Sequence, residues 1–272
     1  MLKTYDELTF ADDFMFCKIM QDNVELCKEL VELVLNRKIG QIICGPEKQK
    51  PITITADGKG IRLDVYFEDD NQTVYDIEMQ TVQTRNLAKR TRYYQAMMDL
   101  NNLKSGASYE KLKESYIVFI CTFDPFHRGY HKYSFTNRCA EVSDLELGDG
   151  TRKIFLCSGG SERDVSEEVS AFLDYIAGID SEGEFVRKLD REVSKARDHL
   201  EWRDEYMSLF LRDEEMVEKG RIEGRIEGQK AGENKLSGLI QNLIFANRSN
   251  EIQEAVSDEA YRKKLYAEFG IG

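Results

Sequence analysis

The 272-residue sequence is poor in proline and histidine and has no long apolar run. Three prolines interrupt it, and 41% of its residues are hydrophobic, which is too apolar a composition for a disordered or low-complexity chain. No run approaches the ~20 apolar residues that span a bilayer, and the N-terminus lacks the apolar block of a signal peptide. We therefore expect a folded protein with no membrane partner that is not exported by that route.

Cysteine spacings typical of disulfide scaffolds and zinc sites are also missing. The six cysteines are scattered without a Cys-x-x-Cys pair, a pattern typical of reduced, mostly buried thiols in a cytoplasm-like compartment. His127 and His131 stand four residues apart, but Pro125 and Gly129 predict a loop there instead of a helix that would align two ligands. We expect a cytoplasmic protein, with a surface turn at these histidines.

Positive charge is in deficit. The chain has 38 Lys and Arg against 50 Asp and Glu, a net charge of −12. This balance excludes a protein that coats nucleic acid or an anionic membrane by bulk charge, so any such contact must come from a local patch. The length suits one core domain with an appendage, because single hydrophobic cores stop growing near ~250–300 residues.

The spacing of apolar residues predicts a mixed α/β core followed by helices. From Asn23 the apolar residues recur at the spacing of an α-helix. Further along they alternate with polar residues, as in a β-strand, and they then return to helical spacing. The expected elements are a helix over 23–35, strands at 52–56, 61–68 and 73–82, a helix over 85–103, a strand at 116–122 and a weaker strand at 153–157. A polar turn at 69–72 joins the second and third strands into a hairpin.

The composition changes near Ser161. Strand signals end, and charged amphipathic helices run from about Asp164 onward. We therefore predict a core domain over 1–160 and an all-helical C-terminal region over 161–272.

A glycine repeat lies within this helical region. Gly220, Gly224, Gly228 and Gly232 follow one another with a period of four, and each costs ~1 kcal/mol relative to alanine in a helix. One interpretation is a solvated, marginal helical linker. Another is a glycine stripe that lets a second helix approach in a homo-oligomer, although a four-residue period drifts by about 40° per repeat around the helix.

The predicted hairpin places acidic side chains on one face. Side chains alternate along a strand, so the odd-numbered residues of 63–67 and 75–79 face the core, and Asp64, Asp76, Glu78 and Gln80 share the other face. In an antiparallel hairpin centred on Asn71, Asp64 lies opposite Glu78 with Cβ atoms ~4.5–5.5 Å apart.

Two opposed carboxylates repel each other and require a compensating charge. Mg²⁺, or Mn²⁺, would supply it through oxygen ligands, polarise a phosphodiester and activate a bound water. Gln80 projects toward the same place and could orient that water or a phosphate oxygen by hydrogen bonding. The alternative is an ordinary solvated strand face with no metal.

A basic stretch follows on the next helix. Arg85, Lys89, Arg90 and Arg92 form a cationic strip beside the acidic pair, which suits contact with DNA. The alternative for this strip is a charged outer helix face.

At these residues the sequence resembles the PD-(D/E)xK nuclease superfamily, in its transposase-associated branch of recombination-promoting nucleases. The similarity covers about 14–157, and its motifs are Asp-Phe-Met-Phe at 13–16, the helix at 23–35, the segments 63–66 and 75–80, the Arg/Tyr helix at 90–94 and the segment 122–124. The resemblance implies a restriction-endonuclease-like αβββαβ core, a mixed sheet flanked by helices. It also implies that Asp64 and Glu78 hold a divalent metal, with the Met79 carbonyl oxygen as a further ligand, and that DNA is the substrate.

One residue departs from the broad superfamily pattern, in which a lysine occupies the position of Gln80. The transposase-associated branch has this glutamine, but the stabilising lysine charge is missing. The superfamily often places an acidic residue on the first helix near the metal, and Glu25 is the candidate here.

The leading hypothesis is thus a Mg²⁺-dependent DNA endonuclease associated with recombination or transposition. The alternative is a catalytically silent DNA-binding or self-assembling scaffold that keeps the nuclease fold.

Overall fold

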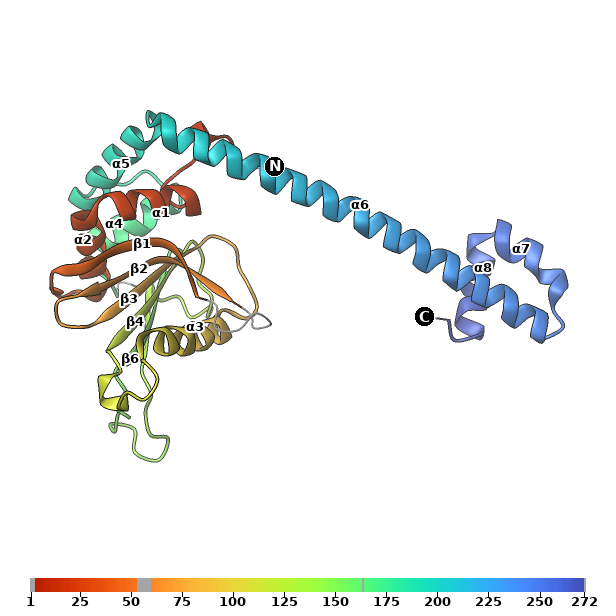
Figure 1. Ribbon diagram of the computed structural model, residues 1–272, viewed down its shortest axis with the longest axis horizontal. Helices are drawn as coiled ribbons and strands as arrows, with labels where there is room; N and C mark the ends of the chain where they lie inside the picture. Colours follow the sequence, from red (N-terminus) through yellow and green to blue (C-terminus); the bar gives the residue numbers. More distant parts are fainter. Residues whose placement is uncertain (1–2, 53–59, 163, 272) are drawn as a thin grey trace. The chain divides into compact units, whose positions relative to one another are not determined.

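The computed structural model describes residues 3–52, 60–162 and 164–271. The chain divides into two compact units, Met1–Tyr206 and Met207–Gly272. The first unit contains a six-stranded mixed sheet with helices on both faces (Figure 1). Its element order contains the αβββαβ order that the resemblance implies, from the second helix to the fourth strand, so the expected fold class is confirmed.

The sheet consists of β1 (Ile42–Ile52), β2 (Ile61–Asp69), β3 (Val74–Gln80), β4 (Ser115–Cys121), β5 (Lys132–Phe135) and β6 (Thr151–Cys157). Its strand order is β1-β2-β3-β4-β6-β5. The first three strands form an antiparallel meander, β4 and β6 lie parallel to β3, and β5 returns antiparallel to β6. Parallel strands require a long crossover, and the one between β3 and β4 carries a helix.

Helices cover both faces of this sheet. On one face lie α1 (Asp13–Asp22) and α2 (Val24–Leu35), backed by α4 (Glu167–Ile176) and α5 (Glu184–Arg197), and on the other lies α3 (Leu87–Asn102) (Figure 1). Short 3₁₀ turns at Tyr5–Glu7 and Tyr109–Lys111 precede α1 and β4. Because both faces are covered, every residue of β3 and β4 is buried.

The predicted hairpin and its register are confirmed. In the β2–β3 ladder, Tyr66 pairs with Asp76 and Phe67 with Tyr75, as expected for a hairpin centred on Asn71. The interpretation of the even-numbered face as a solvated surface is wrong, because α3 packs over it and Asp76 is fully buried. The acidic side chains therefore point into the protein.

The first strand lies earlier than the sequence predicts. We expected it at 52–56, whereas β1 is Ile42–Ile52 and most of the expected segment falls outside the described residues. Two register irregularities interrupt its pairing with β2, and Pro46 and Pro51 lie within it. Proline is tolerated at bulges and on edge strands such as this one, so proline and glycine there do not mark a loop.

The first compact unit extends past the domain boundary expected at 160. The Tyr5 hydroxyl donates to the Ala196 carbonyl oxygen at 2.5 Å, and Lys188 pairs with Glu29 at 2.8 Å, so α5 packs against the N-terminal helices. The end of the unit at Tyr206 therefore does not coincide with the predicted division between 1–160 and 161–272.

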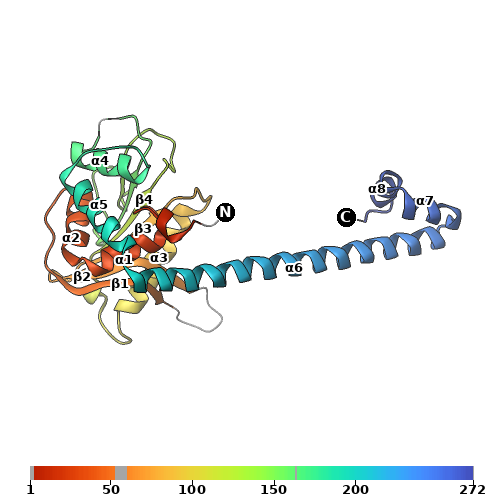
Figure 2. The same ribbon diagram turned by 90° about the horizontal axis from the view of Figure 1, so that it is seen from above.

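The second unit is helical, as predicted. Helix α6 (Leu200–Phe245) runs without interruption (Figure 2), and α7 (Ile252–Ser257) and α8 (Glu259–Glu268) follow the 3₁₀ turn Ser249–Glu251. The buried residues Leu239, Leu243, Ala255 and Leu265 form its core. The glycines at 220, 224, 228 and 232 lie within α6, and a Cβ built on any of them meets no described atom within 4 Å apart from adjacent residues and the backbone of α6 itself. Both interpretations of the glycine repeat stay open.

A buried aspartate holds the turn between β2 and β3. The Asp69 carboxylate accepts hydrogen bonds from the backbone N–H of Gly40 and Asn71 at 3.1 Å, from that of Thr73 at 3.0 Å, and from the Tyr75 hydroxyl at 3.0 Å. These bonds tie the turn to the segment before β1. They fix the register that brings the acidic residues of β2 and β3 together.

We expect Asp69→Ala to lower the free energy of unfolding by about 3 kcal/mol, because it leaves buried donors without an acceptor. Urea denaturation measures this loss. Asp70→Ala is the matched control, since the exposed Asp70 accepts one backbone bond from Gln41 at 2.9 Å and its loss should cost about 1 kcal/mol or less. Equal losses in the two variants would contradict the role of Asp69.

Candidate metal and catalytic site

Asp64 and Glu78 meet where the ladder between β2 and β3 ends. The paired residues run from Glu68 and Val74 to Val65 and Ile77. Beyond them, side chains bridge the two strands: the Asp64 N–H donates to Glu78 Oε1 at 3.0 Å, and the Met79 N–H donates to Asp64 Oδ2 at 3.2 Å. The structure thus brings together the two carboxylates that the sequence paired.

Arg90 contacts Glu78 from α3. Its guanidinium forms an ion pair with Glu78 Oε2 and donates to Gln80 Oε1 at 2.7 Å and to the Tyr94 hydroxyl at 2.9 Å. Arg90 binds the Glu78 oxygen that does not accept from Asp64, so it does not separate the two acids. The sequence predicts Arg90 in a cationic strip beside the acidic pair that contacts DNA, whereas the structure places its guanidinium against Glu78 and Gln80, because its position on α3 faces the sheet.

Asp76 is a third carboxyl group on this face. It is fully buried, and within the described residues neither of its oxygens accepts from an N–H or hydroxyl donor, but its carboxyl group forms a hydrogen bond with that of Glu78. A buried carboxyl group is costly as an anion. Burial and the negative charges of Glu78 and Asp64 accordingly raise the pKa of Asp76 well above its usual range.

Asp13 and Cys17 approach Asp64 from α1. One ligand atom from each of Asp13, Cys17 and Asp64 lies within 4.8 Å of the other two. Asp13 is exposed, whereas Glu78 is fully buried, so the site opens toward solvent on the side of Asp13. Sequence reasoning missed both α1 residues as members of the site. The signal was present, because Asp13 begins the Asp-Phe-Met-Phe motif and Cys17 follows one helical turn later.

Electrostatic repulsion dominates the site. Burial, followed by the negative charges of Glu78 and Asp13, raises the pKa of Asp64 to about 8. Burial also raises the pKa of Glu78, although Arg90 opposes this shift. Arg90 supplies one positive charge against several carboxyl groups, so the site favours either bound protons or an added cation. Carboxylate oxygens are the ligands that hard divalent cations prefer, and the residues present fit such an ion.

The other residues that the sequence predicts for the site do not share one environment. Arg85, Lys89 and Arg92 are exposed. The Met79 N–H is bonded to Asp64, and its side chain is buried. Glu25 is exposed on α2, in a surface pocket that residues of α5 complete, so Asp13 and not Glu25 is the helical acid beside Asp64.

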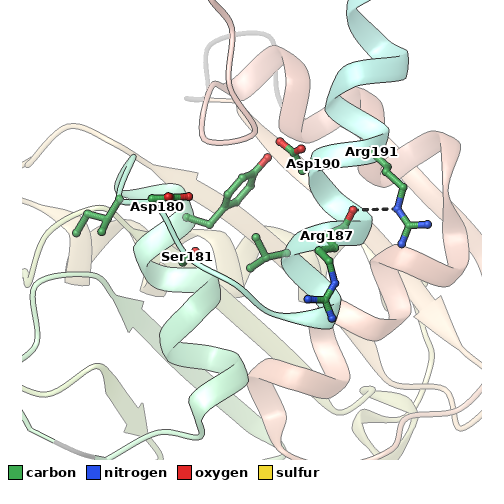
Figure 3. Close-up of a pocket in the computed structure, with 8 residues that line it drawn as sticks. Asp180, Ser181, Arg187, Asp190 and Arg191 are labelled. Carbon is green, nitrogen blue, oxygen red and sulfur yellow. Dashed lines mark hydrogen bonds between the residues drawn. The ribbon is translucent and has the colours of Figure 1, made fainter.

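A separate pocket of about 410 Å³ lies between α4 and α5 (Figure 3). Its lining includes Tyr175, Asp190, Arg187 and Arg191, and the Arg191 Nε–H donates to the Arg187 carbonyl oxygen at 3.1 Å. Burial and the neighbouring Asp190 raise the pKa of Tyr175 to about 12. None of the acidic residues beside Asp64 lines this pocket.

Comparison with known protein families matches residues 11–151 to the PD-(D/E)XK nuclease family transposase. The match covers more than half of the 272 residues, so the chain belongs to this family. The resemblance found in the sequence is thereby confirmed, and the family assigns the chain to the nucleases in general. Comparisons with curated proteins and with solved structures each give no significant match.

Nucleases of the PD-(D/E)XK type generally use divalent metal ions, and this chain has a possible acidic site for one. Within the described residues, no helix combines the length and apolarity needed to cross a bilayer.

The raised pKa of Asp64 predicts how stability depends on pH. An unfolded aspartate has a pKa near 3.9, so between about pH 4 and about pH 8 the folded state holds a proton that the unfolded chain has released. The stability from this proton is complete below about pH 4 and is lost as the pH rises through about 8. In EDTA, Asp64 alone should therefore contribute a fall of up to about 1.4 kcal/mol per pH unit in the free energy of unfolding between about pH 5 and about pH 7, in addition to the contributions of Asp76 and Glu78, whose pKa values are also raised.

Asp64→Asn removes one titrating group and should make the slope shallower than that of the wild type, while its side-chain oxygen can still accept from Met79. Urea denaturation of both proteins across this pH range measures the two slopes. Identical slopes would show that Asp64 does not hold the proton.

Proposed function

We propose that this protein is a Mg²⁺-dependent DNA endonuclease, which also accepts Mn²⁺, and that it acts in recombination or transposition. The observation that carries the proposal is the position of two acidic residues where the β2–β3 ladder ends: the Asp64 backbone N–H donates to the Glu78 carboxylate, and the charge of Glu78 acts on the Asp64 carboxyl group. Membership of a nuclease family supports it. So does the excess of negative charge, which a divalent cation would neutralise.

In this proposal Asp64 and Glu78 hold the metal, with the Met79 carbonyl oxygen as a further ligand, and Asp13 lies beside them. When bound, the ion polarises the phosphodiester and lowers the pKa of an attacking water. The chain itself fixes the ligands: the Met79 N–H orients one oxygen of Asp64, and the Asp64 N–H and Arg90 each orient one oxygen of Glu78. Such outer hydrogen bonds hold ligand groups in place before the substrate arrives.

Gln80 and Arg90 act as a pair in this arrangement. Gln80 accepts from Arg90 at 2.7 Å and donates to the Val82 carbonyl oxygen at 2.5 Å, so both ends of its amide are engaged. The Arg90 guanidinium therefore has a fixed position next to Glu78. We propose that it supplies the positive charge that the missing lysine would otherwise bring, and that Gln80 positions it.

The substrate would approach from the solvent side, where a negatively charged protein needs a local cationic surface. Arg85, Lys89 and Arg92 are exposed on or just before α3 and form the proposed contact with the DNA backbone. Lysine and arginine contacts to phosphates position DNA without reading its sequence. A cytoplasmic location belongs to the same proposal, and the six free cysteines support it.

We expect the purified protein to nick plasmid DNA in the presence of Mg²⁺ and to lose this activity in EDTA. Asp64→Asn and Glu78→Gln should each reduce the rate by about 100-fold or more, because each removes a charged metal ligand while preserving side-chain shape. Nicking is measured by the conversion of supercoiled plasmid to the open circle, and circular dichroism verifies that the variants fold.

Glu25→Gln is the matched control, since it removes an exposed carboxylate outside the site and should leave the rate unchanged. Equal nicking by the wild type and both site variants would assign the activity to a contaminant. DNA retention without nicking, unchanged by EDTA and by both variants, would support the silent DNA-binding scaffold instead.

A further inference from the structure

The loop 124–129 follows β4 at the end of the sheet where the acidic site lies. The Thr122 N–H donates to the Gln80 carbonyl oxygen at 3.1 Å, so the chain that leaves β4 stays beside the chain that leaves β3. Phe126 packs against the core beneath α3, the helix that carries Arg90. The loop therefore borders the site on the face of the sheet that α3 covers.

One carboxylate holds this loop in a fixed conformation. Asp124 accepts hydrogen bonds from the backbone N–H of Phe126 at 2.9 Å, of Arg128 at 2.8 Å and of Gly129 at 2.9 Å, and from the Tyr133 hydroxyl at 2.8 Å. The negative charge of Asp124 is thus directed at N–H groups of its own loop. The exposed tip of the loop lies on this well-anchored base.

The backbone at the tip of the loop is strained. The φ angle of His127 is +53°, in the left-handed region that few residues other than glycine adopt. The Gln83 amide donates to His127 Nε2 at 3.2 Å, so the neutral ring carries its proton on Nδ1. Strained backbone persists mainly at functional sites, and here it places an exposed imidazole against the connection between β3 and α3.

Arg128 adds a positive charge next to this imidazole. It is exposed, and its guanidinium has no ion-pair partner in the part of the chain that the structure describes, although the net charge of the chain is −12. The exposed Arg85 follows Gln83 by two residues and belongs to the proposed DNA contact of α3. Positively charged side chains from two separate segments, the loop 124–129 and the start of α3, thus flank the site.

We propose that the loop 124–129 binds the DNA backbone beside the scissile phosphodiester, with the Arg128 guanidinium and the His127 Nδ1–H as donors to phosphate oxygens. The inference rests on the proposed function and adds a second contact to that of α3. Contacts of this kind position DNA without reading its sequence. The alternative is the surface turn that the sequence predicts, which only connects β4 to β5.

Binding of the full chain to a duplex oligonucleotide in EDTA, measured by fluorescence anisotropy at several salt concentrations, tests the Arg128 contact. Arg128→Ala should weaken binding by about tenfold and lower the slope of log K against log salt by about one, because one phosphate contact is lost. Arg152→Ala is the matched control. It removes the same charge from an exposed residue at the opposite end of the parallel strands, and should change neither quantity.

Plasmid nicking with Mg²⁺ tests the His127 contact. Glycine adopts φ of +53° without strain, so His127→Gly removes the ring and keeps the loop, which the melting temperature verifies. This variant should raise KM for the plasmid by about fivefold and leave kcat within about twofold of the wild type. His127→Asn also tolerates this φ angle and keeps an N–H donor, so it should restore part of the loss.

Equal effects of Arg128→Ala and Arg152→Ala on DNA binding would overturn the proposal, since bulk charge would then explain them. An unchanged KM in His127→Gly would likewise show that the loop is a structural turn. If the wild type nicks plasmid and the loop variants behave as it does, only the loop contact is refuted. A wild type that neither nicks plasmid nor binds the duplex would refute the proposed function itself.

Discussion

The repulsion among carboxyl groups packed between β3 and its covering helix is the constraint on which this structure depends. Asp76 and Glu78 are fully buried, and Asp64 lies beside them. Buried charges of one sign are unfavourable unless protons, a cation or hydrogen bonds compensate them. In this chain Arg90 compensates Glu78, backbone N–H groups contact Asp64 and Glu78, and the Asp76 carboxyl group forms a hydrogen bond with that of Glu78.

The surrounding architecture holds this unfavourable group in place. Asp69 fixes the turn and hence the register, α3 brings Arg90 over the sheet, and α1 brings Asp13 and Cys17 to Asp64. Proteins retain such arrangements mainly at functional sites, where perturbed pKa values concentrate. The same repulsion that raises the pKa of Asp64 becomes an attraction once a divalent cation replaces the protons. Stability and function are therefore linked through the charge of one site.

Local patterns in the sequence were sufficient for the central hairpin. Alternating apolar residues and the polar turn at 69–72 predicted β2, β3 and their register, because a hairpin is a local structure. They also paired Asp64 with Glu78. Edge strand β1 was misplaced because bulges and prolines, tolerated at an edge, interrupt its pattern.

Contacts between distant segments could not be read from the sequence in this way. Arg90 belongs by sequence to a run of basic residues, and only the packing of α3 shows that it turns toward Glu78 while Arg85, Lys89 and Arg92 remain exposed. The choice of Asp13 over Glu25 likewise depends on how α1 meets β2. Both are acidic residues near the start of a helix, and local spacing does not distinguish them.

The exchange of protons for a metal ion is the most direct test of this account. Calorimetry of Mn²⁺ binding near neutral pH, repeated in buffers with different ionisation enthalpies, counts the protons released for each ion bound. The account predicts release of about one proton or more, because the carboxyl groups beside Asp64 must ionise to bind the metal. Metal binding with the same heat in every buffer would contradict it, because the site would then already be ionised before the cation arrives.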